Sequence, residues 1–406
     1  MPNPSYDMVV IGGGIVGLST AMNFTRSFPD LRLAVLEKEN RVAFHQSGHN
    51  SGVIHSGVYY TPGSLKARLC VEGAAAMIAF CAEHDLPCKI CGKVIVATNA
   101  EEQARLDQLL ERGRANGIAG LKLLSREQLL EIEPHCGGLN ALHVPGTGIA
   151  DYAAVCEKYA ELIARQGGVV QIGAKVTGLK EHAGEIEIST TKGPFLTRFA
   201  INCAGLQSDR VARMAGLPAK VMIVPFRGEY YDLIPERRRL VRGLIYPVPD
   251  SRFPFLGVHF TNRVHGGVDA GPNAVLAFKR EGYGRTDFDL RDALGTLAYP
   301  GFWRIAARYW RYGAGEFYRS FRKSAFVTAL QRLLPEIRSS DLVPGGSGVR
   351  AQALARDGSL VDDFQFRKTR NMLHVCNVPS PAATASIPIG RTIVKMAQES
   401  FGLAAR

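Results

Sequence analysis

The pattern of apolar and polar positions over the first 37 residues predicts a strand, a helix and a second strand. Residues 6–11 (YDMVVI) form a short, mostly apolar run, which is typical of a buried strand. Residues 15–28 place apolar side chains on one helical face, and Pro29 and Asp30 end the predicted helix. A second apolar run at residues 32–36 predicts another strand, which ends at Glu37.

The turn between the first strand and the helix has the glycine spacing G-x-G-x-x-G. In such a turn Gly12 permits the sharp bend, Gly14 lets the backbone approach a pyrophosphate, and Gly17 lets helix and strand pack closely. Glu37 lies where a carboxylate accepts ribose hydroxyls and disfavours a 2′-phosphate, so NADP is not expected. FAD and NAD share the adenosine half, so this unit alone does not separate them. The residues expected to contact the dinucleotide here are Gly12, Gly14, Ile15, Val16, Gly17 and Glu37.

The bulk composition indicates a folded protein with an anionic partner. With 406 residues, 46% of them hydrophobic, the chain can bury a large core, and two domains are the natural expectation. The net charge of +12 favours nucleic acid, a membrane surface or an acidic substrate as partner. The first apolar run is short and ends in glycines, so it predicts a strand and not a signal peptide, and no 18-residue apolar window predicts a spanning helix. Ordinary cysteine usage favours reduced thiols and a cytoplasmic location.

A polar segment punctuated by glycine at residues 41–57 (RVAFHQSGHNSGVIHSG) resembles the flavin-contacting loop of the D-amino-acid oxidase and glycerol-3-phosphate dehydrogenase superfamily. Further motifs together resemble the L-2-hydroxyglutarate dehydrogenase (oxidase) family, and the resemblance covers nearly the whole chain. These motifs are VPFRGEY at 224–230, YPVPD at 246–250 running to His259 and Phe260, GPN at 271–273 running to KREGY at 279–283, GVRAQ at 348–352 and SPAAT at 380–384. Residues 284–345 carry no motif that matches the family.

The resemblance implies FAD as cofactor, oxidation of L-2-hydroxyglutarate to 2-oxoglutarate, and delivery of electrons to a membrane acceptor. Residues 174–176, after a predicted strand, could meet the adenine through backbone contacts, and the buried strand at 199–205 ends in small residues at the cofactor edge. A covalent link between a histidine of the loop and the flavin stays open. The further residues expected to contact FAD are Lys38, Ser47, His49, Asn50, Ser51, Gly52, Val176, Ala204, Gly205, Arg350, Ala382, Ala383, Thr384 and Ala385.

The resemblance also implies an α/β protein in which a discontinuous Rossmann-like FAD-binding domain is joined to a substrate domain built on a mixed or antiparallel sheet. We assign residues 1–85, 146–215 and 346–406 to the FAD-binding domain, and residues 86–145 and 216–345 to the substrate domain. Alternating apolar positions at 221–233 and 255–261 predict antiparallel strands for the second domain.

A strand at 374–377 and a turn at 380–390 lead into a last helix. Reduced flavin carries negative charge near N1 and the C2 carbonyl, and a helix N-terminus aimed there would stabilise it. Thr384, Ala385 and Ser386 are the candidates because their small side chains permit close approach. The alternative is an ordinary capped helix.

Oxidation of a 2-hydroxy acid through flavin needs a base for the hydroxyl proton and cations for the carboxylates. Histidine is the expected base, and His55 in the loop and His259 on a strand of the second domain are the candidates. L-2-hydroxyglutarate is a dianion, so at least two cationic or hydrogen-bonding anchors are expected, with Arg350 as first choice because arginine grips a carboxylate at two points. The other candidate anchors are Lys279, Arg252, Arg227, Tyr59, Tyr60 and Tyr246.

Two other patterns raise metal or redox chemistry. His45, His49 and His55 are close in sequence, but their spacing matches no regular ligand pattern, so no metal site is predicted. Cys88 and Cys91 form a C-x-x-C motif, for which a second motif or a thioredoxin-like context is missing.

A basic and aromatic segment at residues 299–326 contains both tryptophans and a large share of the net charge. On a helix over 302–312, its three arginines fall within a sector of about 60° and the aromatic side chains cover the other side. This pattern is typical of a helix lying in a membrane interface. The residues expected to meet the membrane are Trp303, Arg304, Arg308, Trp310 and Arg311.

Two alternatives for this segment remain: a helix packed on the core with a solvated arginine face, and nucleic-acid binding, which we do not predict because no recognition fold accompanies it. The leading hypothesis is an FAD-dependent L-2-hydroxyglutarate dehydrogenase, peripheral on the inner face of the cell membrane, with quinone or another acceptor such as oxygen. The alternatives are oxidation of another small anionic substrate, such as glycerol 3-phosphate or an amino acid, and a non-enzymatic flavoprotein that binds a partner. The oligomeric state stays open.

Overall fold

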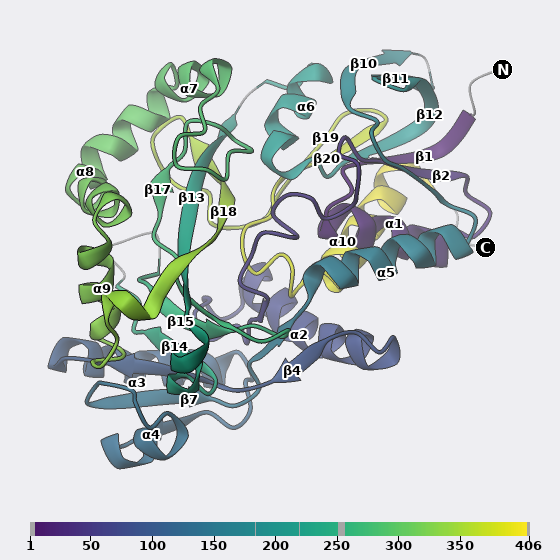
Figure 1. Cartoon of the computed structure of the whole chain (residues 1–406). Helices are drawn as coiled ribbons and strands as arrows, with labels where there is room; N and C mark the ends of the chain where they lie inside the picture. Colours follow the sequence, from purple (N-terminus) through teal and green to yellow (C-terminus); the bar gives the residue numbers. More distant parts are fainter. Residues whose placement is uncertain (1–4, 183, 219, 251–255, 404–406) are drawn as a thin grey trace.

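Two large sheets and a small three-stranded sheet organise the part of the chain that the structure describes (Figure 1). The structure is a computed structural model that describes residues 5–182, 184–218, 220–250 and 256–403. The first large sheet combines the N-terminal strands with strands from the middle and the end of the chain, which confirms the expected mixed α/β fold.

The first sheet is parallel from β12 through β1 and β2 to the edge strand β9, and antiparallel at β10, β11 and β19. Strand β20 pairs in parallel with β12, so segments far apart in sequence are neighbours in the sheet. In order, its strands are β10 (Val176–His182), β11 (Glu185–Thr190), β12 (Gly193–Asn202), β1 (Ser5–Ile11), β2 (Leu33–Leu36) and β9 (Val169–Gln171), with β20 (Met372–Asn377) beside β12 and β19 (Gln365–Lys368) outside β20.

Both faces of this sheet are covered, which explains why residues 6–11 read as one apolar run. Met8 and Val10 point into one core cluster, while Val9 and Ile11 point into another. The helices that pack on the face of Met8 and Val10 are α1 (Ile15–Ser27), α2 (Leu65–Glu83), α5 (Tyr152–Arg165) and α10 (Ser386–Phe401). Helix α6 (Ser208–Met214) packs on the opposite face.

The second large sheet is mostly antiparallel and lies beside the first (Figure 1). Its strand β13 has the bounds predicted from the sequence, Val221–Leu233, and pairs along its length with β18 (Leu342–Ala355). The predicted domain boundary at 345/346 therefore falls inside a strand, and residues through Ala355 belong to the second sheet. Its remaining strands are β17 (Val275–Leu276), β16 (Val268–Gly271), β15 (His259–Asn262), β14 (Leu244–Pro247), β5 (Lys93–Ala97), β7 (Asn140–Val144) and β6 (Lys122–Leu124).

A small sheet connects these parts, and helices flank the second sheet. The small sheet holds β3 (Val53–Ile54), β8 (Gly148–Ala150) and β4 (Cys88–Ile90), and all eight cysteines are free thiols. The helices of the second region are α3 (Ala100–Ala115), α4 (Arg126–Ile132), α7 (Leu290–Leu297), α8 (Pro300–Phe321) and α9 (Lys323–Gln331).

The basic aromatic segment is helical, as predicted, and forms α8 at the outer edge of the molecule (Figure 1). The predicted aromatic face is divided between core and surface, and the helix is kinked at Tyr309, which has non-helical backbone angles. Phe302, Ile305 and Tyr309 pack on the core, whereas Trp303 and Trp310 are 58% and 65% exposed. No helix among the described residues is long and apolar enough to cross a membrane.

Candidate functional site

The glycine turn between β1 and α1 is fixed by close backbone contacts. Gly12 has a φ of +114°, and a Cβ there would lie 2.5 Å from the carbonyl oxygen of Cys203. A Cβ on Gly17 would lie 2.0 Å from the carbonyl oxygen of Gly12, so only glycine lets α1 pack this closely. At Gly14 the nearest atom to a Cβ is the Ser47 hydroxyl at 3.3 Å, which leaves this backbone open to a ligand.

Glu37, at the end of β2, is buried and tied to the same turn. Its Oε2 accepts the N–H of Gly13 at 2.7 Å, and its Oε1 accepts the N–H of Glu39 at 2.8 Å. A carboxylate has about four acceptor positions, so both oxygens can still accept ribose hydroxyls. The turn and its acceptor are therefore held as one unit.

A cavity of about 710 Å³ lies beside this unit, a size suited to a large cofactor. Its lining joins the glycine turn, the loop around Ser47, residues 174–176, residues 203–205 and the segment 375–378 at the end of β20. The residues of the predicted FAD contacts that line it are Gly12, Gly14, Ile15, Val16, Glu37, Lys38, Ser47, Val176, Ala204, Gly205 and Ala382.

Several lining residues were not singled out from the sequence, among them Gln46, Gln207 and Arg210. Gln207 and Arg210 lie around the start of α6, directly after the small residues that end β12, and this position was the available signal. Lys279, expected at the substrate, also lines this cavity together with Glu37 and Lys38.

The other predicted FAD contacts do not line the cavity but shape the loop around it. Asn50 donates to the carbonyls of Gln46 and Ser47 and accepts the N–H of Gly52, which closes the loop on itself. The ring of His49 stacks on Tyr283 with centroids 4.0 Å apart. The predicted contacts outside the lining are Gly17, His49, Asn50, Ser51, Gly52, Arg350, Ala383, Thr384 and Ala385.

Thr384 joins the start of the last helix to the flavin loop. Its buried hydroxyl oxygen accepts the backbone N–H of His55 at 3.0 Å and lies 3.2 Å from the carbonyl oxygen of Val53. Helix α10 begins at Ser386, and Ala382, just before it, lines the cavity. The N-terminus of α10 is thus held beside the cavity.

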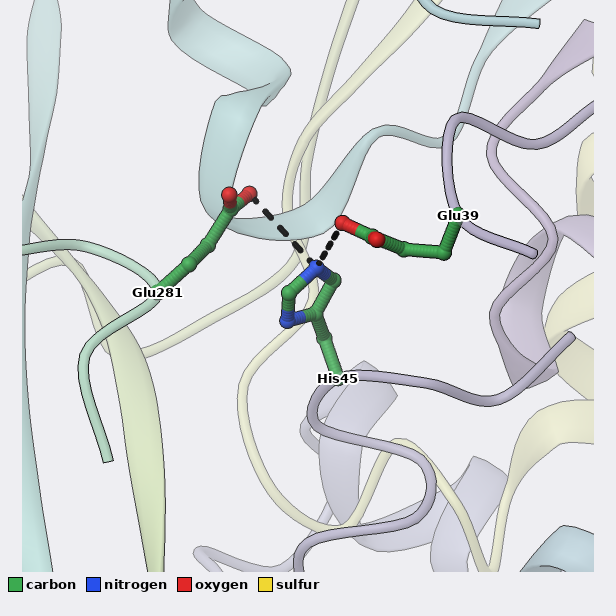
Figure 2. Close-up of side chains that lie close together, drawn as sticks. All are labelled: Glu39, His45 and Glu281. Carbon is green, nitrogen blue, oxygen red and sulfur yellow. Dashed lines mark hydrogen bonds and ion pairs between the residues drawn. The ribbon is translucent and has the colours of Figure 1, made fainter. Parts of the chain in front are cut away.

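A charged cluster closes one side of the cavity, where Figure 2 shows the imidazole of His45 between the carboxylates of Glu39 and Glu281. The His45 Nε2 lies 2.9 Å from a Glu39 oxygen and 3.9 Å from a Glu281 oxygen. These three side chains could hold a metal ion, but the ammonium of Lys38 already lies 2.8 Å from the same Nε2 and 3.0 Å from Glu281. The ion pairs of this cluster therefore connect the flavin loop, which carries His45, to the segment after β17, which carries Glu281.

Of the two candidate bases, His259 is buried and His55 is half-buried, and the two rings interact, since a positive charge on His259 disfavours one on His55. Burial lowers the pKa of His55 to about 3, and the positive charges of Lys93 and His259 add to the shift. Burial also lowers the pKa of His259 to about 3; a hydrogen bond to Gly257 opposes the shift, and Arg350 adds to it. Both rings are therefore neutral at working pH and able to accept a proton.

The hydrogen bonds of the two rings differ. The Nδ1 of His259 lies 2.9 Å from the carbonyl oxygen of Gly257. Because a carbonyl only accepts, this nitrogen carries the proton and Nε2 keeps its lone pair. The Nδ1 of His55 is buried and has no hydrogen-bond partner among the residues that the structure describes.

The predicted carboxylate anchors fall into three groups. Arg350, Tyr59 and Tyr246 lie around the two histidines: the charge of Arg350 acts on His259, and Tyr246 stacks on the His259 ring. Arg227 instead forms a buried ion pair with Glu229 at 2.8 Å and donates to the carbonyl of Gly284. Tyr60, under the ammonium of Lys66, is buried nearby, and Arg252 lies outside the described residues.

Lys93, which was not singled out from the sequence, lies among the side chains of His55, His259, Arg350, Tyr59 and Tyr246, and this group is called the chamber below. This lysine is the first residue of β5 and is only 2% exposed, with its Nζ 4.5 Å from the ring centre of Tyr59 and 5.2 Å from that of Tyr246. The only signal in the sequence was one lysine at the start of the apolar run KVIVA.

Comparison with known proteins gives matches over nearly the whole chain. The FAD dependent oxidoreductase family model matches residues 7–396. An L-2-hydroxyglutarate dehydrogenase from Indibacter alkaliphilus is 51% identical over 397 residues, which cover 98% of this chain and 100% of that protein. An L-2-hydroxyglutarate dehydrogenase from Escherichia coli K12 is 48% identical over 394 residues, covering 97% of this chain and 93% of that protein.

The fold is also that of a solved structure, the dithionite-reduced L-α-glycerophosphate oxidase from Mycoplasma pneumoniae with FAD bound. The TM-score is 0.79 and the identity 21%, over 97% of this chain and 95% of that chain. At this identity the likeness concerns the fold alone.

Proposed function

The chain belongs to the L-2-hydroxyglutarate dehydrogenase family of FAD-dependent oxidoreductases, and on that premise we propose that it oxidises L-2-hydroxyglutarate to 2-oxoglutarate with FAD as cofactor. The observation that carries the proposal is the 51% identity over nearly the full length of both chains. The cavity beside the glycine turn and Glu37 supports the cofactor, because its open backbone at Gly14 and its buried acceptor suit an ADP moiety.

When bound, FAD supplies a hydride acceptor at N5. The chain supplies the rest of the chemistry: a proton acceptor, cations for the carboxylates and a buried chamber. The proton acceptor is one of the two neutral imidazoles, His55 or His259, and Arg350 is placed to hold the carboxylate next to the reacting carbon. Anionic substrate in the chamber favours the protonated imidazole, so binding makes either ring a stronger base than its free pKa implies.

The test is anaerobic reduction of the purified holoenzyme. Addition of L-2-hydroxyglutarate should bleach the flavin absorbance and release one 2-oxoglutarate per flavin, while the D-enantiomer should not. Reduction by glycerol 3-phosphate or an amino acid, with none by L-2-hydroxyglutarate, would overturn the proposed substrate. A flavin that no substrate in the panel reduces would overturn the enzyme assignment.

We also propose that the chain docks on a membrane through α7 and α8 and passes its electrons to quinone there. Helix α7 exposes Leu290, Leu294 and Leu297, which are spaced along one face, and the indole N–H of Trp303 donates to the Leu297 carbonyl at 2.7 Å. The apolar stripe of α7 thus adjoins the exposed Trp303 of α8.

Exposed cations accompany this apolar surface. Arg308 and Arg311 are exposed on α8, each within about 6 Å of a neighbouring aromatic ring. Anionic lipid attracts each such cation by about 1 kcal/mol. This combination supports peripheral attachment, for which we propose the inner face of the cell membrane.

The attachment is tested by replacing Arg304, Arg308 and Arg311 with glutamine. The variant should leave the membrane pellet, while turnover with a soluble dye stays as in the wild type. A matched control removes three exposed arginines elsewhere, Arg114, Arg165 and Arg391, and should still sediment with membranes. If the α8 variant pellets like the control, the attachment proposal is wrong.

A further inference from the structure

The buried ammonium of Lys93 is not compensated by any carboxylate among the residues that the structure describes. It forms no hydrogen bond or ion pair with a described residue, and its Nζ lies over the rings of Tyr59 and Tyr246. Burial lowers the pKa of Lys93 to about 8, and the only group that opposes the shift is the Cys70 thiol. A buried ammonium without an anion is costly, so its retention in a core strand indicates that an anion is supplied from outside.

Lys93 points to the same side of the sheet as Tyr246. Strands β5 and β14 are parallel, with Leu244 opposite Lys93 and Tyr246 opposite Ile95. Residues two apart in a strand share a face, so the lysine and the tyrosine both face the chamber. The hydroxyl of Tyr59, on the other ring beneath the ammonium, is also buried without a hydrogen-bond partner among the described residues. The ammonium and this hydroxyl are therefore both buried polar groups in need of a hydrogen-bond acceptor.

The Lys93 ammonium lies close enough to the proposed proton acceptors for one small molecule to contact both. Tyr246 contacts Lys93 at 5.2 Å and His259 at 3.9 Å, measured from its ring centre, so the two cannot be farther apart than these distances together. The charge of Lys93 also acts on both His55 and His259. A five-carbon acid whose hydroxyl meets an imidazole can therefore reach Lys93 with its far end.

We propose that Lys93 binds the second carboxylate of the substrate, at C5, and thereby selects dicarboxylic over monocarboxylic 2-hydroxy acids. This inference rests on the proposed function. Arg350, whose charge also acts on His259, holds the C1 carboxylate, so the two cations grip opposite ends of the substrate. Lys93 does not touch the reacting atoms; it determines specificity.

The test compares two substrates of equal length, L-2-hydroxyglutarate and L-2-hydroxypentanoate, which has a methyl group in place of the C5 carboxylate. In Lys93→Met, kcat/KM for the dicarboxylate should fall by about 10² to 10³, as when one partner of a buried charge pair is removed. For the monocarboxylate it should stay within about threefold of the wild-type value. An equal loss for both substrates would assign Lys93 a structural role and overturn the inference.

A binding measurement gives a readout that does not depend on turnover. The products 2-oxoglutarate and 2-oxopentanoate are titrated into the holoenzyme and followed by the change in flavin absorbance. Lys93→Met should weaken binding of 2-oxoglutarate by a similar factor and leave 2-oxopentanoate unchanged. The melting temperature of the substrate-free variant should not fall, because the change removes an uncompensated buried charge.

Lys66 offers a matched control. Its ammonium also lies over a tyrosine ring, 4.9 Å from the centre of Tyr60, but it has a carboxylate partner in Asp362. Lys66→Met should leave the ratio of the two kcat/KM values unchanged. If it changes that ratio as much as Lys93→Met does, the selectivity is a general effect of positive charge and the inference fails.

Two outcomes separate this inference from the function on which it rests. A wild-type flavin that L-2-hydroxyglutarate does not reduce defeats the proposed function. A wild-type enzyme that oxidises L-2-hydroxyglutarate and L-2-hydroxypentanoate equally well defeats the role of Lys93 alone, without any variant. Should Lys93→Met fail to retain FAD, Lys93→Gln is used for the same comparisons, with the same outcomes for and against.

Discussion

The ring of His259 lies nearly flat on the ring of Tyr246, with centroids 3.9 Å apart and planes inclined by 23°. Because the Nδ1 of the same imidazole is hydrogen-bonded to Gly257, both the plane and the tautomer of the ring are set before a substrate arrives. The second imidazole, His55, is positioned from a different element, a loop fixed by Thr384. The two candidate bases are thus held by independent supports, and single variants can separate them.

Replacement of the proton acceptor by alanine should slow flavin reduction by about 10² to 10⁴ while FAD stays bound. We expect this loss in one of the two variants, His55→Ala or His259→Ala, and a smaller effect dominated by KM in the other. Stopped-flow absorbance at a series of L-2-hydroxyglutarate concentrations measures both the rate of flavin reduction and the concentration dependence on which KM relies. Full rates in both variants would exclude both imidazoles and point to a bound water as the base.

The acid side of the pH profile should be flat. Burial lowers the pKa of both imidazoles to about 3, and the base works in its neutral form, so activity is lost only as the pH falls through that value. Between pH 5 and 8, kcat/KM should therefore show no inflection near the ordinary histidine pKa of about 6.5. An inflection there that disappears in His55→Ala or His259→Ala would show that the ring is protonated in the free enzyme.

The alkaline side of the pH profile of kcat/KM should reflect the loss of charge on Lys93. Burial lowers its pKa to about 8, so the ammonium loses its charge as the pH rises through that value, and the affinity for a dicarboxylate falls with it. Burial raises the pKa of Cys70 to about 12 and holds that of Tyr59 well above its ordinary value, so neither group titrates near pH 8. We expect kcat/KM for L-2-hydroxyglutarate to decline above pH 8 and that for L-2-hydroxypentanoate to stay level. Parallel declines would contradict this assignment.

Two glycines of the N-terminal turn should respond differently to alanine. At Gly17 a Cβ would meet the Gly12 carbonyl, so Gly17→Ala should destabilise the protein by about 1–3 kcal/mol or more, seen as a lower melting temperature. At Gly14 a Cβ meets only the Ser47 hydroxyl, so Gly14→Ala should fold normally and bind FAD more weakly. Reconstitution of apoprotein with FAD measures the second effect; equal melting temperatures for the two variants would refute the distinction.

Arg227 should be a stability residue. Its guanidinium is paired with Glu229 in the interior, and removal of one partner of a buried pair costs about 3–5 kcal/mol. Arg227→Met should therefore lower the free energy of unfolding in urea while the folded fraction keeps its KM for L-2-hydroxyglutarate. A large rise in KM with unchanged stability would instead place this arginine at the substrate.

The parts of the fold that were predictable are those specified by local sequence. The glycine turn, the bounds of β13 and the helix over 302–312 all follow from spacing within a few residues. Which of the aromatic side chains of α8 meet the core was not predictable. Even a straight helix sets Trp303 and Trp310 about 140–160° away from Ile305, but only tertiary packing decides that Ile305 is buried and the tryptophans are exposed.

The site was predictable to the extent that its residues occur in motifs. Glu37 and Ser47 were found because the dinucleotide turn and the flavin loop have recognisable spacing. Lys93 was missed because burial of a charge depends on which strands flank it, and β14, which lies beside it, is some 150 residues away in sequence. Arg227 was assigned to the substrate for the opposite reason: it stands in a visible motif, but that its guanidinium is buried against Glu229 of the same motif is known only from the fold.

The contacts between the start and the end of the described chain have a consequence for synthesis of the protein. Strand β1 needs β12 beside it, β12 needs β20, and the Ser19 hydroxyl of α1 donates to the Ser386 carbonyl of α10 at 2.8 Å. The lining of the nucleotide pocket includes Gly12 near the start of the chain and Ala382 almost 400 residues along it. A nascent chain therefore lacks a finished binding site until β20 and α10 have emerged from the ribosome, so cofactor capture follows their synthesis and not that of the glycine turn.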